Sequence, residues 1–246
     1  MEISDTQEKR DKGRRAEEVA VWFLRLNGVF TIQNFIVHPD KVSTHPSTEA
    51  DVLGIRMSNS FEGVHRSRTE LVKMSDHEDL TKAAKVGTVI KNLALVVEVK
   101  ASRCHINGPW SEERAEKARF RSNMERVLGR IGCFSRQDVV TAAEEMNRNL
   151  RYEGQAFVAQ YFAIGDTKNS DLAVRYPQLV QLTFGDIATF LYQRFRKFPE
   201  KIPEAVEIDQ WPGFGDRFRR WFYLSQRDPS ECARWVRNYI EVGPLT

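Results

Sequence analysis

The feature that most constrains this chain is an uninterrupted apolar segment that ends in two charges. Residues 93–97 are Leu-Ala-Leu-Val-Val, and Glu98, Val99 and Lys100 follow at once. A short run of this kind is typical of a strand buried on both faces of a sheet. Ionised side chains are costly to bury at such a place unless they are paired or bind a ligand. The end of this strand is therefore the first candidate for a functional site.

The remaining apolar pattern predicts a mixed α/β fold. Apolar residues recur at helical spacing over residues 6–27, and Gly28 supplies the stop. Residues 29–37 and 49–56 are rich in β-branched and aromatic side chains or alternate in polarity, which predicts two strands. Farther along we expect helices from Ser111 and Ser135, strands over 155–164 and 179–183, and helices over 187–194, 214–222 and from Asp228. This order is typical of a sheet with helices packed on it.

The predicted elements divide the chain into a core and an extension. We expect the core over residues 1–183 and a C-terminal helical extension, packed on the core, over residues 184–246. Within the core, residues 58–92 form a long insertion in which short apolar pieces are separated by charges. A connection of this length usually carries function or is mobile.

Composition excludes several classes of protein. Apolar residues make up 41% of the chain, and 15 Phe and 5 Trp are enough to build a core, which excludes a disordered chain. No apolar run approaches the roughly 20 residues that a membrane helix needs, and the charged N-terminal segment does not resemble a signal peptide. We therefore expect a soluble cytoplasmic protein without a membrane partner.

The cofactor chemistry that remains is that of carboxylates. The 3 Cys and 5 His are dispersed, with no C-x-x-C or H-E-x-x-H motif, so zinc is not expected. There is also no P-loop, and we expect no nucleotide cofactor. The net charge of +3 is too small to establish a nucleic-acid partner by itself. Any metal chemistry in this chain must therefore depend on Asp and Glu.

The apolar strand and its neighbour bring such carboxylates together. Side chains alternate across a strand, so Glu98 and Lys100 face the same way, roughly 7 Å apart. If the strand that begins near Asp51 is its neighbour, Asp51 and Glu98 converge, and the Val99 carbonyl adds a third oxygen. Such oxygen ligands suit Mg²⁺ or Mn²⁺. Lys100 would then orient a water or stabilise charge on phosphorus, which is the equipment for phosphodiester hydrolysis.

The alternative interpretation of this triplet is structural. In a chain of ordinary composition, an E-x-K triplet arises by chance about once in this length. Taken alone, it is more often a salt bridge on an edge strand than a catalytic pair. Its position at the end of an apolar run, downstream of a strand that opens with an acid, favours the functional interpretation.

The same residues resemble the PD-(D/E)xK nuclease superfamily, in which a strand-opening Asp and an E-x-K strand form the metal site. Residues 12–17, Lys-Gly-Arg-Arg-Ala-Glu, are similar to the K-G-x-x-(G/A)-E opening of resolvase-like members, including archaeal Holliday-junction resolvases and small bacterial relatives. Residues 49–51, Glu-Ala-Asp, resemble the E-x-D motif of the bacterial relatives. The resemblance covers roughly residues 9–57 and 92–103. The long gap before Glu98 and the long chain after it depart from the small resolvases.

The resemblance implies a restriction-endonuclease-like fold, a central mixed sheet flanked by helices. It implies catalytic roles for Asp51, Glu98 and Lys100, with Mg²⁺ or Mn²⁺ on the two carboxylates and the Val99 carbonyl. It also implies that Glu17 reaches the metal cluster from the first helix. DNA is the substrate class of the resembling families, and many nucleases of this fold act as homodimers.

Helical geometry favours Glu17 over its neighbour Glu18. Glu17 shares a face with Val21 and Leu24 at the border of the apolar stripe, so it can point into the fold. Glu18 falls on the side that we expect to be wetter. An ordinary acid in an early turn of the helix remains the alternative.

A basic segment follows the apolar strand. Residues 101–130 contain seven Lys or Arg against four Glu, a local charge of +3. Because this segment follows the candidate catalytic strand directly, it is suited to follow a phosphate backbone. The nucleic-acid-binding candidates are Arg103, Arg114, Lys117 and Arg121. A solvated helix face with charge pairs four residues apart is the alternative.

The sequence therefore predicts a metal-dependent DNA endonuclease that acts in repair, recombination or defence against foreign DNA. A rival prediction is a nuclease-derived nucleic-acid-binding or regulatory subunit without turnover. A second rival is a helical interaction protein whose function lies in residues 184–246. The converging carboxylates count against the first rival, since a non-catalytic domain gains little from them.

Overall fold

The computed structural model describes residues 5–37, 48–59, 77–110, 123–197 and 228–243. In chain order the elements are α1 (Asp5–Leu26), β1 (Val29–Val37), β2 (Thr48–Arg56), α2 (Glu78–Ala84), β3 (Lys85–Val86), β4 (Val89–Ile90), β5 (Asn92–Val99), a 3₁₀ turn η1 (Gly108–Trp110), α4 (Asn123–Ile131), α5 (Arg136–Asn149), β6 (Arg151–Glu153), β7 (Phe157–Gly165), α6 (Ser170–Arg175), β8 (Val180–Thr183), α7 (Phe184–Lys197) and α10 (Pro229–Val242).

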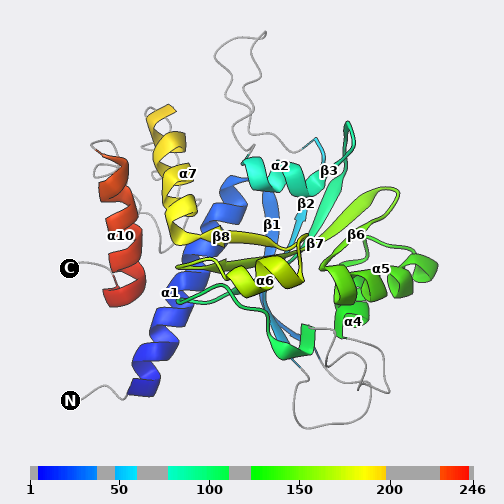
Figure 1. Ribbon diagram of the computed structural model, residues 1–246, viewed down its shortest axis with the longest axis horizontal. Coiled ribbons are helices and arrows are strands. Elements are labelled where there is room, and N and C mark those ends of the chain that lie inside the picture. The colour runs from blue at the N-terminus through cyan, green and yellow to red at the C-terminus, as the bar shows by residue number, and fades with distance from the viewer. Residues whose placement is uncertain (1–4, 38–47, 60–76, 111–122, 198–227, 244–246) are drawn as a thin grey trace.

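A mixed sheet forms the centre of the molecule (Figure 1). Its strand order is β1-β2-β5-β7-β6, and β8 also pairs with β7. The β1–β2 and β2–β5 pairs are antiparallel, whereas β5 and β7 are parallel. The apolar strand β5 is thus central, with a neighbour on each side, and seven of its eight residues are buried. Burial on both faces explains why its sequence is apolar without alternation.

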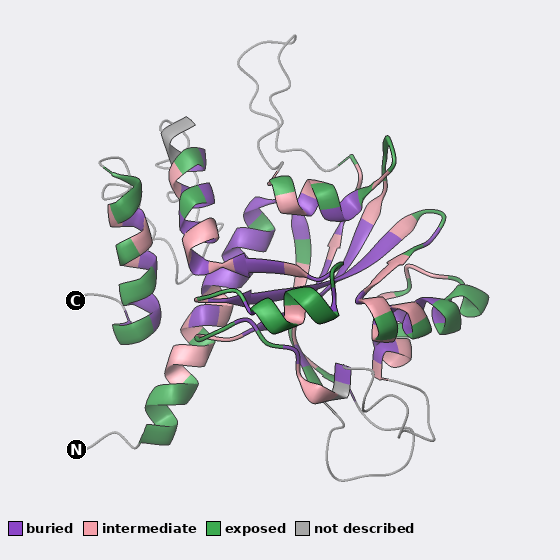
Figure 2. Cartoon of the chain, in the orientation of Figure 1, coloured by how far each residue is buried: buried purple, intermediate pink, exposed green. Residues whose placement is uncertain are grey.

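Helices cover both faces of the sheet. One core cluster joins α1, α2, α7 and α10 to side chains of β5 and β7, and includes Phe23, Leu95 and Phe162. The second joins α4 and α5 to the opposite side of the same strands, and includes Val96 and Tyr161. Figure 2 shows β5 and β7 largely buried between helices whose outer faces are exposed, whereas much of the edge strand β1 is exposed. The predicted mixed α/β architecture with helices on the sheet is therefore confirmed.

Local sequence signals located most of these elements. The strands predicted over 29–37 and 179–183 and the caps at Ser135 and Asp228 are confirmed, and each cap side chain accepts from the backbone N–H of the first helical turn. Within the predicted insertion the structure has a short helix, α2, and the β3–β4 hairpin. The short elements β6 and α6 were not predicted. The expected helix start at Ser111 and the helix over 214–222 lie outside the described residues.

The C-terminal helices α7 and α10 pack against α1. Val236 and Ile240 of α10 belong to the same core cluster as Ala16 and Phe23 of α1. The Arg15 guanidinium donates to the carbonyls of Ile240 and Glu241 at the end of α10, at 2.9 and 2.8 Å. The division at residue 183 remains a prediction, but these helices complete the core layer that holds α1. None of the described helices is long and apolar enough to cross a membrane.

Close packing around Gly165, beside the candidate site, predicts that a larger residue there destabilises the fold. A Cβ added at Gly165, the last residue of β7, would lie 2.6 Å from both the Cys104 nitrogen and the Ser102 carbonyl oxygen. Because both neighbours are backbone, Gly165→Ala must displace the loop that follows Lys100. We expect a loss of about 2 kcal/mol and a Tm lower by about 4–8 °C, measured by thermal unfolding.

The matched control is Gly13→Ala in α1, where an added Cβ meets nothing within 4 Å. This change should leave Tm unchanged or raise it, because Ala stabilises a helix relative to Gly by up to about 1 kcal/mol. Equal Tm values for the two variants would contradict the packing described at Gly165.

Candidate active site

Strand register places Asp51 beside Glu98. Val52 of β2 pairs with Val97 of β5, and the next position outward in this antiparallel register matches Asp51 with Glu98. Side chains at matched positions of an antiparallel pair lie on the same face, with Cβ atoms about 5 Å apart. The convergence of these two carboxylates, predicted from the sequence, follows directly from this register.

Asp51 lies where the regular β1–β2 ladder is interrupted. The pairs Gln33–Val52 and Phe35–Ala50 flank this position, but Asn34 and Asp51 themselves do not pair. Asn34 has a left-handed backbone, with φ of 52°, which Asn tolerates better than most residues. The Asp51 carboxylate lies against β5, where its Oδ2 accepts from the Val99 N–H at 2.7 Å.

Glu98 is the most enclosed member of the site. Its side chain is 1% exposed, and its Oε2 accepts from the Tyr161 hydroxyl of β7 at 3.3 Å. Burial and the nearby Asp51 charge raise the pKa of Glu98 to about 7, although Lys100 and Tyr161 oppose this shift. Burial likewise raises the pKa of Asp51, against Lys100 and the Val99 N–H.

Lys100 lies between the two carboxylates. Its ammonium contacts Oε1 of Glu98 and is 3.7 Å from Oδ2 of Asp51. Burial disfavours the ammonium, but Glu98, Asp51 and Glu17 outweigh this effect, so the pKa of Lys100 is raised above its usual value. Lys100 is therefore a cation at neutral pH. Its side chain is 34% exposed, so it faces the solvent side of the pair.

Glu17 approaches from α1. Burial, and then repulsion from Asp51 and Glu49, raise the pKa of Glu17 to about 7, while Lys100 lowers it. These couplings place Glu17 in the same electrostatic cluster as the strand residues, as predicted. Glu18 does not join it: its Oε2 accepts from the Tyr239 hydroxyl of α10 at 2.6 Å. The side of α1 that was expected to be wetter is only partly so, because Arg25 is exposed whereas Trp22 is buried.

The Val99 carbonyl faces the same side as Asp51. The Lys100 N–H donates to the Ile164 carbonyl of β7 at 2.9 Å. Across a trans peptide, N–H and C=O point in opposite directions. The Val99 carbonyl therefore points away from β7, toward β2. Two carboxylates and one carbonyl thus meet at one edge of the β2–β5 pair.

These donors fit a hard divalent cation. All three are oxygens, the chemistry that Mg²⁺ and Mn²⁺ prefer. With their carboxyl groups ionised, Glu17, Asp51, Glu98 and Lys100 would carry a charge of −2, which a divalent cation balances. In the described part of the chain, no three His, Cys, Asp or Glu side chains are spaced to hold a metal by themselves. A metal here would have to use the Val99 carbonyl and water as well.

The predicted nucleic-acid contacts are only partly described. Arg103 is exposed, three residues beyond Lys100, and forms a backbone bridge with Thr167. Arg114, Lys117 and Arg121 lie outside the described residues. The exposed position of Arg103 close to Lys100 is compatible with a nucleic-acid contact, which stays a prediction.

Two residues of the site were not predicted. Tyr161 lies in an apolar strand, where a tyrosine hydroxyl needs a buried partner, and that requirement was the available signal. Asn34 lies within a strand rich in apolar residues, and its tolerance of positive φ was a weaker signal. Neither could be placed beside the carboxylates before the strand order was known.

No protein-family model, curated protein or solved structure matches this chain.

The raised pKa of Glu17 predicts that this residue destabilises the folded state increasingly as pH rises. The unfolded chain releases this proton near pH 4.5 and the folded chain near pH 7. Between these values the native state binds more protons, so the stability contribution falls as pH rises and is lowest above pH 7. Glu17→Gln should therefore stabilise the metal-free protein at pH 8, by on the order of 2 kcal/mol, and change little at pH 4.5.

Denaturant unfolding in EDTA at several pH values measures this difference. Glu144→Gln, at an exposed position on α5, is the matched control and should show no such trend. A difference between Glu17→Gln and wild type that stays constant from pH 4.5 to 8 would contradict the described environment of Glu17.

Proposed function

We propose that this protein is a metal-dependent nuclease that hydrolyses phosphodiester bonds in DNA. The observation that carries the proposal is the meeting of Asp51, Glu98 and Lys100 at the end of the central strand, with Glu17 approaching from α1. The same four residues carry the resemblance to the PD-(D/E)xK superfamily. Ordinary salt bridges occur at the surface, but here one of the carboxylates is fully buried.

The proposal includes a restriction-endonuclease-like core. The mixed sheet, with antiparallel β1, β2 and β5 followed by parallel β7, supports it, as do the helices on both faces. In this proposal α1 brings Glu17 to the sheet, and α7 and α10 hold α1 from outside.

Asp51, Glu98 and the Val99 carbonyl would hold Mg²⁺ or Mn²⁺. Such an ion, when bound, polarises a phosphoryl oxygen and lowers the pKa of water. Lys100, a cation at neutral pH, orients the attacking water and stabilises negative charge that develops on the phosphoryl group. Glu17 adds negative charge, and a hydrogen-bond acceptor when ionised, on the α1 side. Tyr161 fixes the orientation of Glu98 by donating to it.

A nuclease-derived binding or regulatory subunit without turnover is the second candidate. The observation that favours it is the position of Lys100, whose ammonium already contacts Glu98 and lies 3.7 Å from Asp51. Such pairing neutralises part of the charge that would attract a metal. The cleavage experiment below separates the two candidates.

The wider context belongs to the proposal as well. DNA is proposed as the partner because the resembling families act on it, and the protein is proposed to work in the cytoplasm, as a homodimer where both strands are cut. Repair, recombination and defence against foreign DNA are compatible pathways. The site chemistry does not favour one of them.

Cleavage of supercoiled, linear, single-stranded and four-way DNA with Mg²⁺ or Mn²⁺ tests the proposed activity. We expect wild type to cut at least one substrate and Lys100→Ala to be at least about 100-fold slower, because a charge-stabilising donor is lost. Circular dichroism checks that the variant is folded.

Lys82→Ala is the matched control, because Lys82 is an exposed lysine of α2 paired with Glu78. It should retain wild-type cleavage. If wild type binds DNA and cuts none of the four substrates with either metal, the nuclease proposal fails and the binding subunit replaces it.

Direct metal binding provides an independent test. Electron paramagnetic resonance of free Mn²⁺ should show binding to wild type, and Glu98→Gln should weaken it by about tenfold or more, since loss of even an outer partner of a metal ligand has that effect. Glu144→Gln is again the control. Equal Mn²⁺ binding by wild type and Glu98→Gln would remove Glu98 from the proposed metal site.

A further inference from the structure

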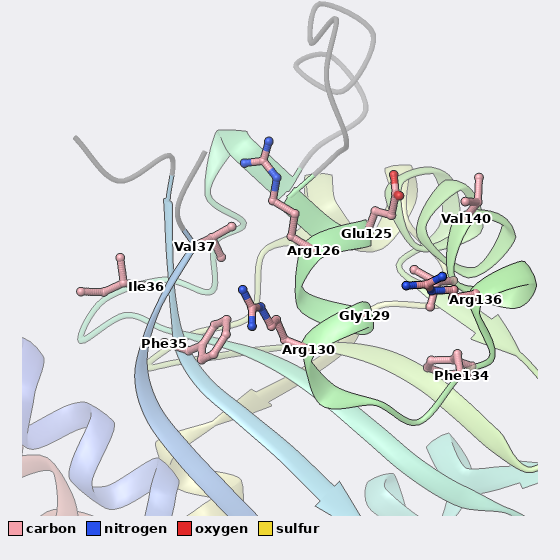
Figure 3. A pocket seen from close by; sticks show the side chains of 11 residues that line it. Phe35, Ile36, Val37, Glu125, Arg126, Gly129, Arg130, Phe134, Arg136 and Val140 are labelled. Atoms are coloured by element: carbon pink, nitrogen blue, oxygen red, sulfur yellow. The ribbon is translucent and has the colours of Figure 1, made fainter. Parts of the chain in front are cut away.

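A cavity of about 920 Å³ lies between the end of β1, α4 and α5 (Figure 3). It is separate from the four site residues. Its lining combines basic and apolar side chains, and comprises Phe35, Ile36, Val37, Glu125, Arg126, Gly129, Arg130, Phe134, Arg136, Val139 and Val140.

The lining suits a ligand that is both anionic and flat. Three arginines against one glutamate give the walls a charge of +2. Two phenylalanines, Phe35 and Phe134, supply aromatic surface. Arginine pairs with phosphate oxygens, and aromatic rings stack on nucleobases. We propose that this cavity binds a nucleotide of a single-stranded segment of the nucleic acid on which the candidate active site acts; the inference rests on the proposed function.

The β1 wall of the cavity pairs with the part of β2 that carries Asp51. Phe35 and Ile36 of the cavity wall pair with Ala50 and Glu49. Asp51 is the next residue of β2, so the β1 wall lies roughly 10 Å or less from the Asp51 backbone at about 3.3 Å per residue. A strand held in the cavity is thereby placed to continue toward the carboxylates.

The lining residues lie on both sides of α4, an arrangement that suits an extended ligand such as a chain. Figure 3 shows Arg126 and Arg130 on the side of α4 that faces β1, and Arg136 on the other side, near Phe134 and Val140. Gly129 lies on α4 between them, and an added Cβ there would meet only Val139 Cγ1, at 3.9 Å. The cavity therefore extends across α4 at a residue without a side chain.

One of the aromatic walls is held in place before any ligand binds. The Phe134 ring packs edge-to-face against Tyr152 and Phe157, with ring centroids 5.7 and 6.1 Å apart. A fixed ring loses little freedom when a base stacks on it. Arg130 and Arg136, in contrast, are exposed and can reach phosphate groups at the surface.

Fluorescence anisotropy of a labelled 12-nucleotide single-stranded DNA, in EDTA to prevent turnover, tests the proposal on the full chain. We expect Arg130→Ala/Arg136→Ala to raise Kd at least about tenfold and to lower the slope of log K against log salt by about 1.4, from about 0.7 per lost phosphate contact. The same variant should affect a duplex of equal length much less.

Arg14→Ala/Arg148→Ala is the matched control, because both arginines are exposed, outside the cavity and change net charge equally. Equal Kd values for the two double variants overturn the proposal. If Arg130→Ala/Arg136→Ala loses as much affinity for the duplex as for the single strand, the proposal is overturned in favour of general binding to the phosphate backbone. Deoxythymidine monophosphate and the unlabelled strand are compared as competitors of the labelled strand. If both displace it at the same concentration, the proposal is overturned in favour of a site for a free nucleotide.

Gly129→Leu fills the cavity without changing charge and favours the helix by propensity. It should weaken single-strand binding about as much as the double arginine variant, whereas Gly129→Ala should not. Unchanged binding in Gly129→Leu overturns the proposal. Binding by Lys100→Ala is measured alongside to separate the cavity proposal from the nuclease proposal. If single-strand binding is lost in the cavity variants and kept in Lys100→Ala, the cavity proposal is supported even when the wild type cleaves no DNA.

Discussion

The candidate site is dominated by buried carboxylates whose negative charge exceeds the positive charge beside them. Glu98 is held at the end of a central strand, where its carboxylate is almost completely removed from water. Asp51 lies opposite Glu98 on β2, and Glu17 interacts electrostatically with Asp51 and Lys100. The Lys100 ammonium contacts Glu98 and lies 3.7 Å from Asp51. One ammonium does not balance three carboxylates, so burial and mutual repulsion raise the pKa of Glu17 and Glu98 to about 7. A divalent cation would relieve this conflict, which is why the nuclease proposal accounts for an arrangement that costs stability.

The rest of the fold holds these groups at the same point. The β1–β2 ladder is interrupted between Asn34 and Asp51, and the Val99 N–H of β5 fixes the Asp51 carboxylate. Glu17 comes from α1, and α1 is held against α10 by shared core side chains. Arg15 of α1 also donates to the Ile240 carbonyl of α10. The C-terminal helices are therefore part of the support of the site, a role that their sequence alone did not suggest.

Local signals were sufficient for most elements because they act over a few residues. The cap at Ser135 and the Asp228-Pro229 pair each start a helix through contacts within one turn. Short elements such as β6 and α6 escaped prediction, because three to six residues carry too little periodicity and form only against a partner strand or helix. The contact between Glu18 and Tyr239 could not be predicted either, because the two residues are more than two hundred positions apart in the sequence.

The sequence by itself determined that the chain has a buried strand with Glu98 and Lys100 at its end, and that Asp51 lies near the start of another strand, which in the structure begins earlier, at Thr48. These follow from residue polarity and spacing, which are local. The tertiary structure alone decided that β2 lies beside β5 in the register that faces Asp51 with Glu98, and that Tyr161 reaches them. It also decided that Arg130 and Arg136 border one cavity next to that site, since packing of distant segments depends on the sum of many contacts that no local pattern encodes.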